Sequence, residues 1–240
     1  PRQRRQQQAA QAAARQHRWT RGDWQLLPWL LGIGRGRHGM PAIGRAKMLD
    51  NLRRSLLAPC VVLAVGASGL MPYAAGLIAL GWLLIVVVVP FFLPVLTQIV
   101  PRRAVPASQH ARTLLADLRQ AGWQAGLTLT FLADQAWRMA DAIVRTLWRL
   151  LVSRRHMLEW TTAAQTAVGP RPRLLEHYRA GAGGVALAVV MSGLLLWLNP
   201  TGWLCTLPLT MLWIVAPAIA LWTSRGSPSA RPSAARPRSA

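Results

Sequence analysis

Two long stretches of the sequence carry no charged side chain. The first covers residues 55–101 and the second covers residues 180–224, so they are 47 and 45 residues long. About 20 apolar residues suffice for one helical crossing of a bilayer, and each stretch therefore has the length of two crossings. We expect an all-α, polytopic membrane protein with two transmembrane helical hairpins. A soluble fold would have to bury both stretches in its core, so we set that alternative aside.

Turn-forming residues near the middle of each stretch predict where the two hairpins bend. Met71-Pro72 interrupts the first stretch, and the Asn-Pro-Thr-Gly sequence at residues 199–202 interrupts the second. These turns leave four candidate spans, at residues 56–70, 73–94, 184–198 and 203–222. Pro90 and Pro94 fall inside the second span, where we expect them to kink the helix.

The charges outside these stretches predict the topology. The chain has 28 lysines and arginines against 7 aspartates and glutamates, a formal charge of +21, although 52% of its residues are hydrophobic. Arginines flank both stretches, whereas the bends at Met71 and Asn199 carry no charge. Because basic flanks stay in the cytoplasm, we expect a multi-pass protein of the bacterial inner membrane with both termini cytoplasmic. The excess charge then reflects orientation in the bilayer, and no nucleic-acid partner is expected.

The charge pattern divides the chain into five parts. They are a cytoplasmic or interfacial segment at 1–54, a transmembrane hairpin at 55–101, a cytoplasmic helical insertion at 102–179, a second hairpin at 180–224 and a tail at 225–240. The tail contains almost only Gly, Ser, Pro, Ala and Arg, a composition typical of disorder. The insertion is expected to be helical.

One predicted helix of the insertion, at residues 131–152, is strongly amphipathic. Its charged residues recur on one face and form two i,i+4 pairs, Asp134 with Arg138 and Asp141 with Arg145. The opposite face collects Ala136, Ala140, Ile143, Val144, Leu147, Leu150 and Leu151. Such a helix either lies on the inner leaflet of the membrane or packs against a larger cytosolic domain, and the sequence leaves both alternatives open.

Local motifs predict neither a catalytic residue nor a metal ligand in this chain. The five histidines are dispersed, and no two of the seven acidic residues are closer than seven positions apart. Residues 34–39 match Gly-x-Gly-x-x-Gly, but Pro41 follows at once and no acidic residue stands where a dinucleotide fold requires one. We therefore interpret residues 34–39 as a loop.

Residues 16–25 combine arginines with tryptophans. Guanidinium groups hold phosphate oxygens in a bidentate manner, and indoles stack on sugar rings or lie at the headgroup boundary. The combination suits either a nucleotide-sugar or glycan site at a membrane surface, or an interfacial helix that is anchored to lipid.

This segment resembles the Gln-x-x-Arg-Trp motif of processive membrane glycosyltransferases. More narrowly, residues 18–25 (RWTRGDWQ) and 47–56 (KMLDNLRRSL) look like the end of the glycosyltransferase part of cyclic β-1,2-glucan synthases. Two further blocks, at residues 136–165 and 213–220, are similar to the same family in the same order. The resemblance covers about residues 15 to 225.

The resemblance implies an enzyme that uses UDP-glucose and a divalent cation, Mg²⁺ or Mn²⁺, to extend a β-1,2-glucan. It assigns Arg18 to the diphosphate or donor and Trp19 to the acceptor sugar. The glutamine of the motif is displaced, because Arg15 stands three residues before Arg18 and Gln16 is one residue too close. The aspartates of the motif set, with their nucleotide-binding domain, are expected before residue 1, and the large phosphorylase-like region of the family after residue 224.

The expected function is that of a membrane-embedded fragment of such a glucosyltransferase, inactive alone. Its partners are then the lipid bilayer and, only when it is joined to the missing catalytic domain, UDP-glucose and glucan. The alternative is a small inner-membrane scaffold or interaction protein that is derived from such a synthase.

Overall fold

A computed structural model of the chain describes residues 15–32, 41–99, 106–153 and 174–225, and every regular element within these ranges is a helix. The all-α membrane fold is therefore confirmed for the described residues. Three expectations lie outside them: the tail after residue 225, the loop at residues 34–39, and the part of the resembling block that follows residue 153.

The first hairpin consists of α3 (Ala42–Gly69) and α4 (Tyr73–Leu96). The bend at Met71-Pro72 is confirmed, and Pro72 stands directly before α4. The helix of the first predicted span begins at Ala42, well before the charge-free stretch, because residues 42–54 also favour a helix. This additional part carries Asp50, whose carboxylate pairs with the guanidinium groups of Arg53 at 2.8 Å and Arg54 at 2.7 Å.

The second hairpin consists of α8 (Ala182–Leu198) and α9 (Pro200–Arg225), with the predicted bend at Asn199. Among the described helices, three are long and apolar enough to cross a membrane: α3, α4 and residues 200–223 of α9. The 17-residue α8 reaches that length only together with α7 (Leu174–Ala180), from which it is bent by 71°. The third predicted span, at residues 184–198, is thus a short helix with a sharp bend at Gly181.

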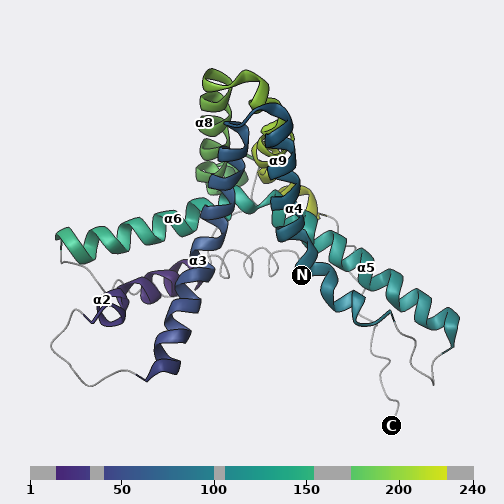
Figure 1. Cartoon of the computed structure of the whole chain (residues 1–240), viewed down its shortest axis with the longest axis horizontal. Coiled ribbons are helices and arrows are strands. Elements are labelled where there is room, and N and C mark those ends of the chain that lie inside the picture. The colour runs from purple at the N-terminus through teal and green to yellow at the C-terminus, as the bar shows by residue number, and fades with distance from the viewer. Residues whose placement is uncertain (1–14, 33–40, 100–105, 154–173, 226–240) are drawn as a thin grey trace, which may run out of the picture.

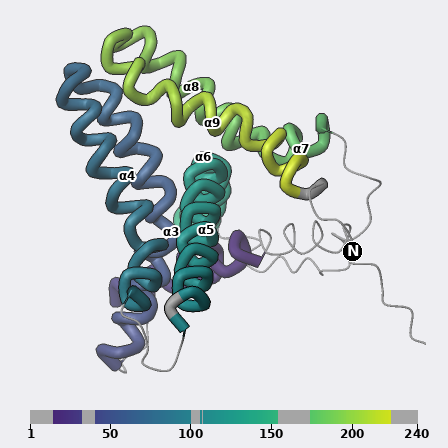
Figure 2. The backbone as a smooth tube through the Cα atoms, turned by 90° about the vertical axis from the view of Figure 1, so that its right-hand side faces the viewer, coloured from purple at the N-terminus to yellow at the C-terminus, as the bar shows by residue number. Residues whose placement is uncertain are grey.

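The two hairpins meet at their bends. The side-chain amide of Asn199 donates from Nδ2 to the backbone oxygens of Gly69 at 3.3 Å and Met71 at 2.9 Å. Its Oδ1 accepts from the backbone N–H of Gly202 at 3.2 Å, which caps the start of α9 behind Pro200. Both bends lie near the top of Figure 1, and Figure 2 shows the hairpins separating from that point toward their other ends.

Two further helices occupy the space between the diverging hairpins. These are α5 (Ala107–Thr130) and α6 (Leu132–Trp148), which meet at Phe131, and a π-helical turn η1 (Arg149–Ser153) follows. In Figure 1, α5 and α6 extend to opposite sides of the hairpins, transverse to the spans and at the end away from the bends. The helix predicted over residues 131–152 therefore corresponds to α6 with η1.

The core lies where α6 meets both hairpins. Its buried residues come from α3, α4, α6, α8 and α9: Ala58, Val61, Val62, Val65, Leu80, Leu132, Ala133, Ala136, Ala188, Cys205, Leu209 and Trp213. Small residues let the helices approach closely, as in other membrane bundles. Trp213 is 1% exposed, and its Nε1 donates to the backbone oxygen of Leu129 at 2.9 Å. This bond ties α9 to the last turn of α5, where backbone oxygens lack partners within the helix.

The predicted apolar face of the amphipathic helix is divided in the structure. Ala136 and Ile143 are buried against the bundle, whereas Val144 is 64% exposed and Leu151 is 69% exposed. Both predicted i,i+4 ion pairs are confirmed, at 2.7 Å for Arg138 with Asp134 and 2.6 Å for Arg145 with Asp141.

Candidate functional site

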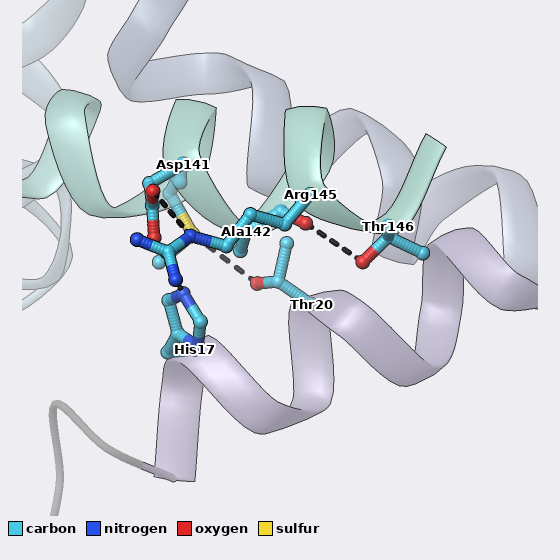
Figure 3. Close-up of polar contacts among 7 residues, drawn as sticks. His17, Thr20, Asp141, Ala142, Arg145 and Thr146 are labelled. Atoms are coloured by element: carbon cyan, nitrogen blue, oxygen red, sulfur yellow. Dashed lines mark hydrogen bonds and ion pairs between the residues drawn. The ribbon is translucent and has the colours of Figure 1, made fainter. Parts of the chain in front are cut away.

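The Arg-Trp segment forms a helix over residues 15–25 that packs on α6. The His17 ring approaches the Asp141 carboxylate, with 3.2 Å between Nε2 and Oδ2. The hydroxyl of Thr20 donates to the sulfur of Met139, also at 3.2 Å, and Thr20 is 4% exposed. Figure 3 shows His17 and Thr20 facing α6, with the Arg145 guanidinium next to the same carboxylate.

The same helix also contacts the first hairpin at the beginning of its charge-free stretch. Trp24 donates from Nε1 to the hydroxyl of Ser55 at 2.9 Å, and that hydroxyl donates in turn to the backbone oxygen of Leu52 at 2.7 Å. The carboxylate of Asp23 accepts from Nδ2 of Asn51 at 3.2 Å. The short helix α2 (Leu27–Leu30) follows, and Gly32 with φ of 71° comes directly after it. The Arg-Trp helix is therefore fixed against both α6 and α3.

The residues predicted to bind substrate lie on the other side of this helix. At about 100° per residue, the three anchoring residues at 17, 20 and 24 fall within roughly 60° of one another. Arg18 and Trp19 lie roughly 130° to either side of the centre of that anchoring face. Trp19 is 69% exposed, and Arg18 and Gln16 are exposed as well. The structure thus presents Arg18 and Trp19 away from α3 and α6. Gln16 lies one turn before Thr20 along the helix and closer to the anchoring face than either of them.

The two carboxylates of α6, Asp134 and Asp141, lie in different electrostatic surroundings. Asp141 is shared between the His17 ring and the Arg145 guanidinium and stays about one quarter exposed. Asp134 lies against the start of α8, and this burial raises the pKa of its carboxyl, while the charge of Arg138 acts in the opposite direction. Asp141 therefore positions the Arg-Trp helix, and Asp134 lies at the junction between α6 and the second hairpin.

The divalent cation that the resemblance implies, Mg²⁺ or Mn²⁺, is held mainly by oxygen ligands, with carboxylates of the protein beside substrate phosphates and water. Within residues 15–32, 41–99, 106–153 and 174–225, no group of three or more His, Cys, Asp or Glu side chains is close enough together to form a metal site. We assign the described residues no metal-dependent step.

Comparison with known proteins adds evidence that is independent of this geometry. No protein-family model matches the chain. In an alignment of 219 residues that covers 89% of the chain, it is 41% identical to the cyclic beta-(1,2)-glucan synthase NdvB of Rhizobium meliloti (strain 1021). The chain resembles a glucan synthase. The match spans 8% of the length of NdvB, so the chain corresponds to a small part of that synthase. The resemblance expected from the sequence blocks is confirmed, and the chain is a glucan-synthase-related protein with membrane helices.

Sequence reasoning missed the residues that hold the Arg-Trp helix in place. In the sequence, His17 is only one of five dispersed histidines, and Asp141 is only the i,i+4 partner of Arg145. The positions 17, 20 and 24 follow a helical 3, 4 spacing, which was a usable signal for a buried face. Their partners on α6 are more than 100 residues away in sequence, and no local pattern predicts them.

Proposed function

We propose that this chain is the membrane-embedded part of a glucosyltransferase that builds β-1,2-glucan from UDP-glucose. The main observation in support of this proposal is that the Arg-Trp helix is anchored to its neighbours. Buried contacts to α6 and α3 fix one face of this helix, and the opposite face offers a guanidinium beside an exposed indole. The topology that accompanies the proposal places the Arg-rich ends in the bacterial cytoplasm, at the inner membrane, and the two bends outside.

Each residue of the pair has a proposed role. The Arg18 guanidinium holds oxygens of the diphosphate by charge-assisted hydrogen bonds. The Trp19 indole stacks on the acceptor sugar. Inverting transfer also needs a base for the acceptor hydroxyl and a means of carrying the charge of the leaving diphosphate. In this proposal a separate catalytic domain supplies both, and the present chain supplies the membrane platform on which donor and acceptor meet.

A chimera tests the proposal. The segment of NdvB that matches this chain is replaced by the corresponding residues of this chain, and membranes containing the chimera are given radiolabelled UDP-glucose. We expect labelled β-1,2-glucan, because a platform of the same function can substitute for the original. A chimera that is present in the membrane at the level of native NdvB and makes no glucan would contradict the proposal and favour a scaffold protein instead.

Substitutions in the active chimera test the two roles. Hydrogen bonds to charged groups contribute about 1.5–3 kcal/mol, so Arg18→Gln is expected to raise the KM for UDP-glucose roughly 10- to 100-fold. Trp19→Ala is expected to reduce glucan elongation with little change in that KM. The matched control is Trp29→Ala, which removes another exposed indole of the same segment, 62% exposed, that is not part of the motif. Equal effects of the two tryptophan variants would refute the role of Trp19.

The isolated chain provides a further test. We expect purified protein in detergent to release no UDP from UDP-glucose, since the proposal places the catalytic base in a separate domain. Reproducible release of UDP by the purified chain, abolished by Arg18→Gln, would show that the chain itself carries the reaction.

A further inference from the structure

An exposed apolar stripe runs along α6 and into η1. Its members follow one another at steps of 7, 4 and 3 residues, which places them within about 60° on the helix. They are Trp137, Val144, Trp148 and Leu151, with exposed fractions of 46%, 64%, 61% and 69%. A stripe of this kind on a soluble protein surface marks an interaction site, because isolated exposed apolar residues are common but aligned ones are not.

Among the described residues, the neighbouring elements leave this stripe uncovered. The Arg-Trp helix packs on Met139, on a different side of α6, and its His17 reaches Asp141 at the edge of the stripe. The start of α8 reaches the stripe at one end only, where a side chain at Gly183 would overlap the indole of Trp137. The stripe therefore begins where α8 leaves α6.

The surface of α8 continues the stripe toward the bilayer. Val190 is 66% exposed and Trp197 is 79% exposed, as expected for side chains of a membrane hairpin that face lipid. Figure 1 shows α6 transverse to the hairpins, at the end away from their bends. Guanidinium groups of Arg138 and Arg145 lie on the polar side of the same helix, within reach of headgroup phosphates.

We propose that the stripe of α6 is a lipid-binding surface, and that α6 lies at the headgroup boundary of the same bilayer that the hairpins span. The indoles of Trp137 and Trp148 occupy the boundary, and Val144 and Leu151 contact the acyl chains. The Arg-Trp helix then lies on the other side of α6 and is held at a fixed depth through it, without inserting into lipid itself. This inference concerns a lipid partner and does not depend on the proposed transferase activity.

Spin labels on the full chain test this inference. Cys60→Ala and Cys205→Ser remove the two native thiols, and the serine keeps a hydroxyl within reach of the Gly202 oxygen, which Cys205 contacts at 2.7 Å. A nitroxide is then attached in separate variants at Val144→Cys, Leu151→Cys or Arg145→Cys. The protein is reconstituted into phosphatidylcholine and phosphatidylglycerol vesicles, and the accessibility of each label to oxygen and to a water-soluble nickel chelate is measured.

Val144 and Arg145 form a matched pair, since they are adjacent and their exposed fractions are 64% and, for the side chain, 63%. At Val144 and Leu151 we expect oxygen accessibility to exceed nickel accessibility, with the order reversed at Arg145. Two results would overturn the inference: nickel accessibility at Val144 and Leu151 as high as at Arg145, which indicates water, or low accessibility to both reagents, which indicates cover by protein.

A second measurement keeps the native cysteines. Lipids brominated close to the headgroup quench indoles at the boundary, so the native protein should lose a larger fraction of its fluorescence than Trp148→Phe does. An equal or larger fractional loss in Trp148→Phe would also overturn the inference.

Discussion

Gly184 is the point at which α8 approaches α6 most closely through backbone atoms, and replacing it by alanine tests that junction. A Cβ at Gly184 would lie 2.7 Å from both the nitrogen and the Cα of Asp134, and 2.9 Å from its Cβ. Real Cβ contacts are essentially never shorter than 3.0 Å. Backbone atoms of a helix cannot rotate away, so Gly184→Ala has to push the two helices apart.

Two opposing contributions determine how far Gly184→Ala changes the free energy of unfolding. Overpacking of a well-packed contact destabilises a protein by about 1–3 kcal/mol. Alanine is also a better helix former than glycine, by up to about 1 kcal/mol in a helix interior. Gly193→Ala isolates the first contribution, because Gly193 lies on the same helix and a Cβ there would meet nothing within 4 Å. The free energy of unfolding of Gly184→Ala should therefore be about 1–3 kcal/mol below that of Gly193→Ala.

Unfolding in mixed micelles measures this difference. The protein is titrated with increasing mole fractions of dodecyl sulfate, and the loss of tertiary structure is followed by near-UV circular dichroism. Both variants should show the same helix content before the transition, with an earlier midpoint for Gly184→Ala. Coincident midpoints for the two variants would refute the close contact between α6 and α8 and the reasoning built on it.

Three further predictions use the same unfolding assay. Asn199→Asp keeps the oxygen that caps α9 but loses both hydrogen bonds to the first hairpin. The free energy of unfolding should therefore fall by about 1–2 kcal/mol, and an unchanged value would contradict the link between the bends. Trp213→Phe should destabilise by about 1–3 kcal/mol because the part-buried oxygen of Leu129 loses its indole donor, and an unchanged midpoint would argue against that bond. Burial raises the pKa of Asp134 in the folded state above its unfolded value, so the stability present below the unfolded pKa is lost as the pH rises through the folded pKa. Asp134→Asn should therefore gain stability relative to the native protein as the pH rises above the unfolded pKa of about 4, and parallel pH profiles would contradict the raised pKa.

The membrane architecture was accessible from the sequence because it depends on local features. A charge-free stretch of sufficient length and a turn signal at its middle are enough to specify a hairpin, and both bends, at Met71 and Asn199, occur where the turns predicted them. The ion pairs of α6 were equally predictable, since an i,i+4 spacing brings the two side chains together in any helix.

The sequence does not predict which segments pack together, because periodicity identifies the buried face of a helix but not the element that covers this face. His17 contacts Asp141 across 124 positions, and Trp213 reaches the oxygen of Leu129 across 84 positions. The apolar arc of α6 is wide enough to contain both a buried side and an exposed stripe, and the residues of both are equally apolar. Only the placement of α3, α8 and the Arg-Trp helix around α6 separates Ala136, which is buried, from Val144, which is exposed.

These contacts make α6 the element through which the hairpins and the Arg-Trp helix influence each other. Asp134 lies against α8, and Asp141, seven residues further along the same stiff helix and about 10 Å away, holds His17. A displacement of α8 that shifts Asp134 must therefore also shift the carboxylate that positions the Arg-Trp helix. We accordingly expect Gly184→Ala to alter the environment of Trp19 although the two positions share no contact, whereas Gly193→Ala leaves that environment unchanged.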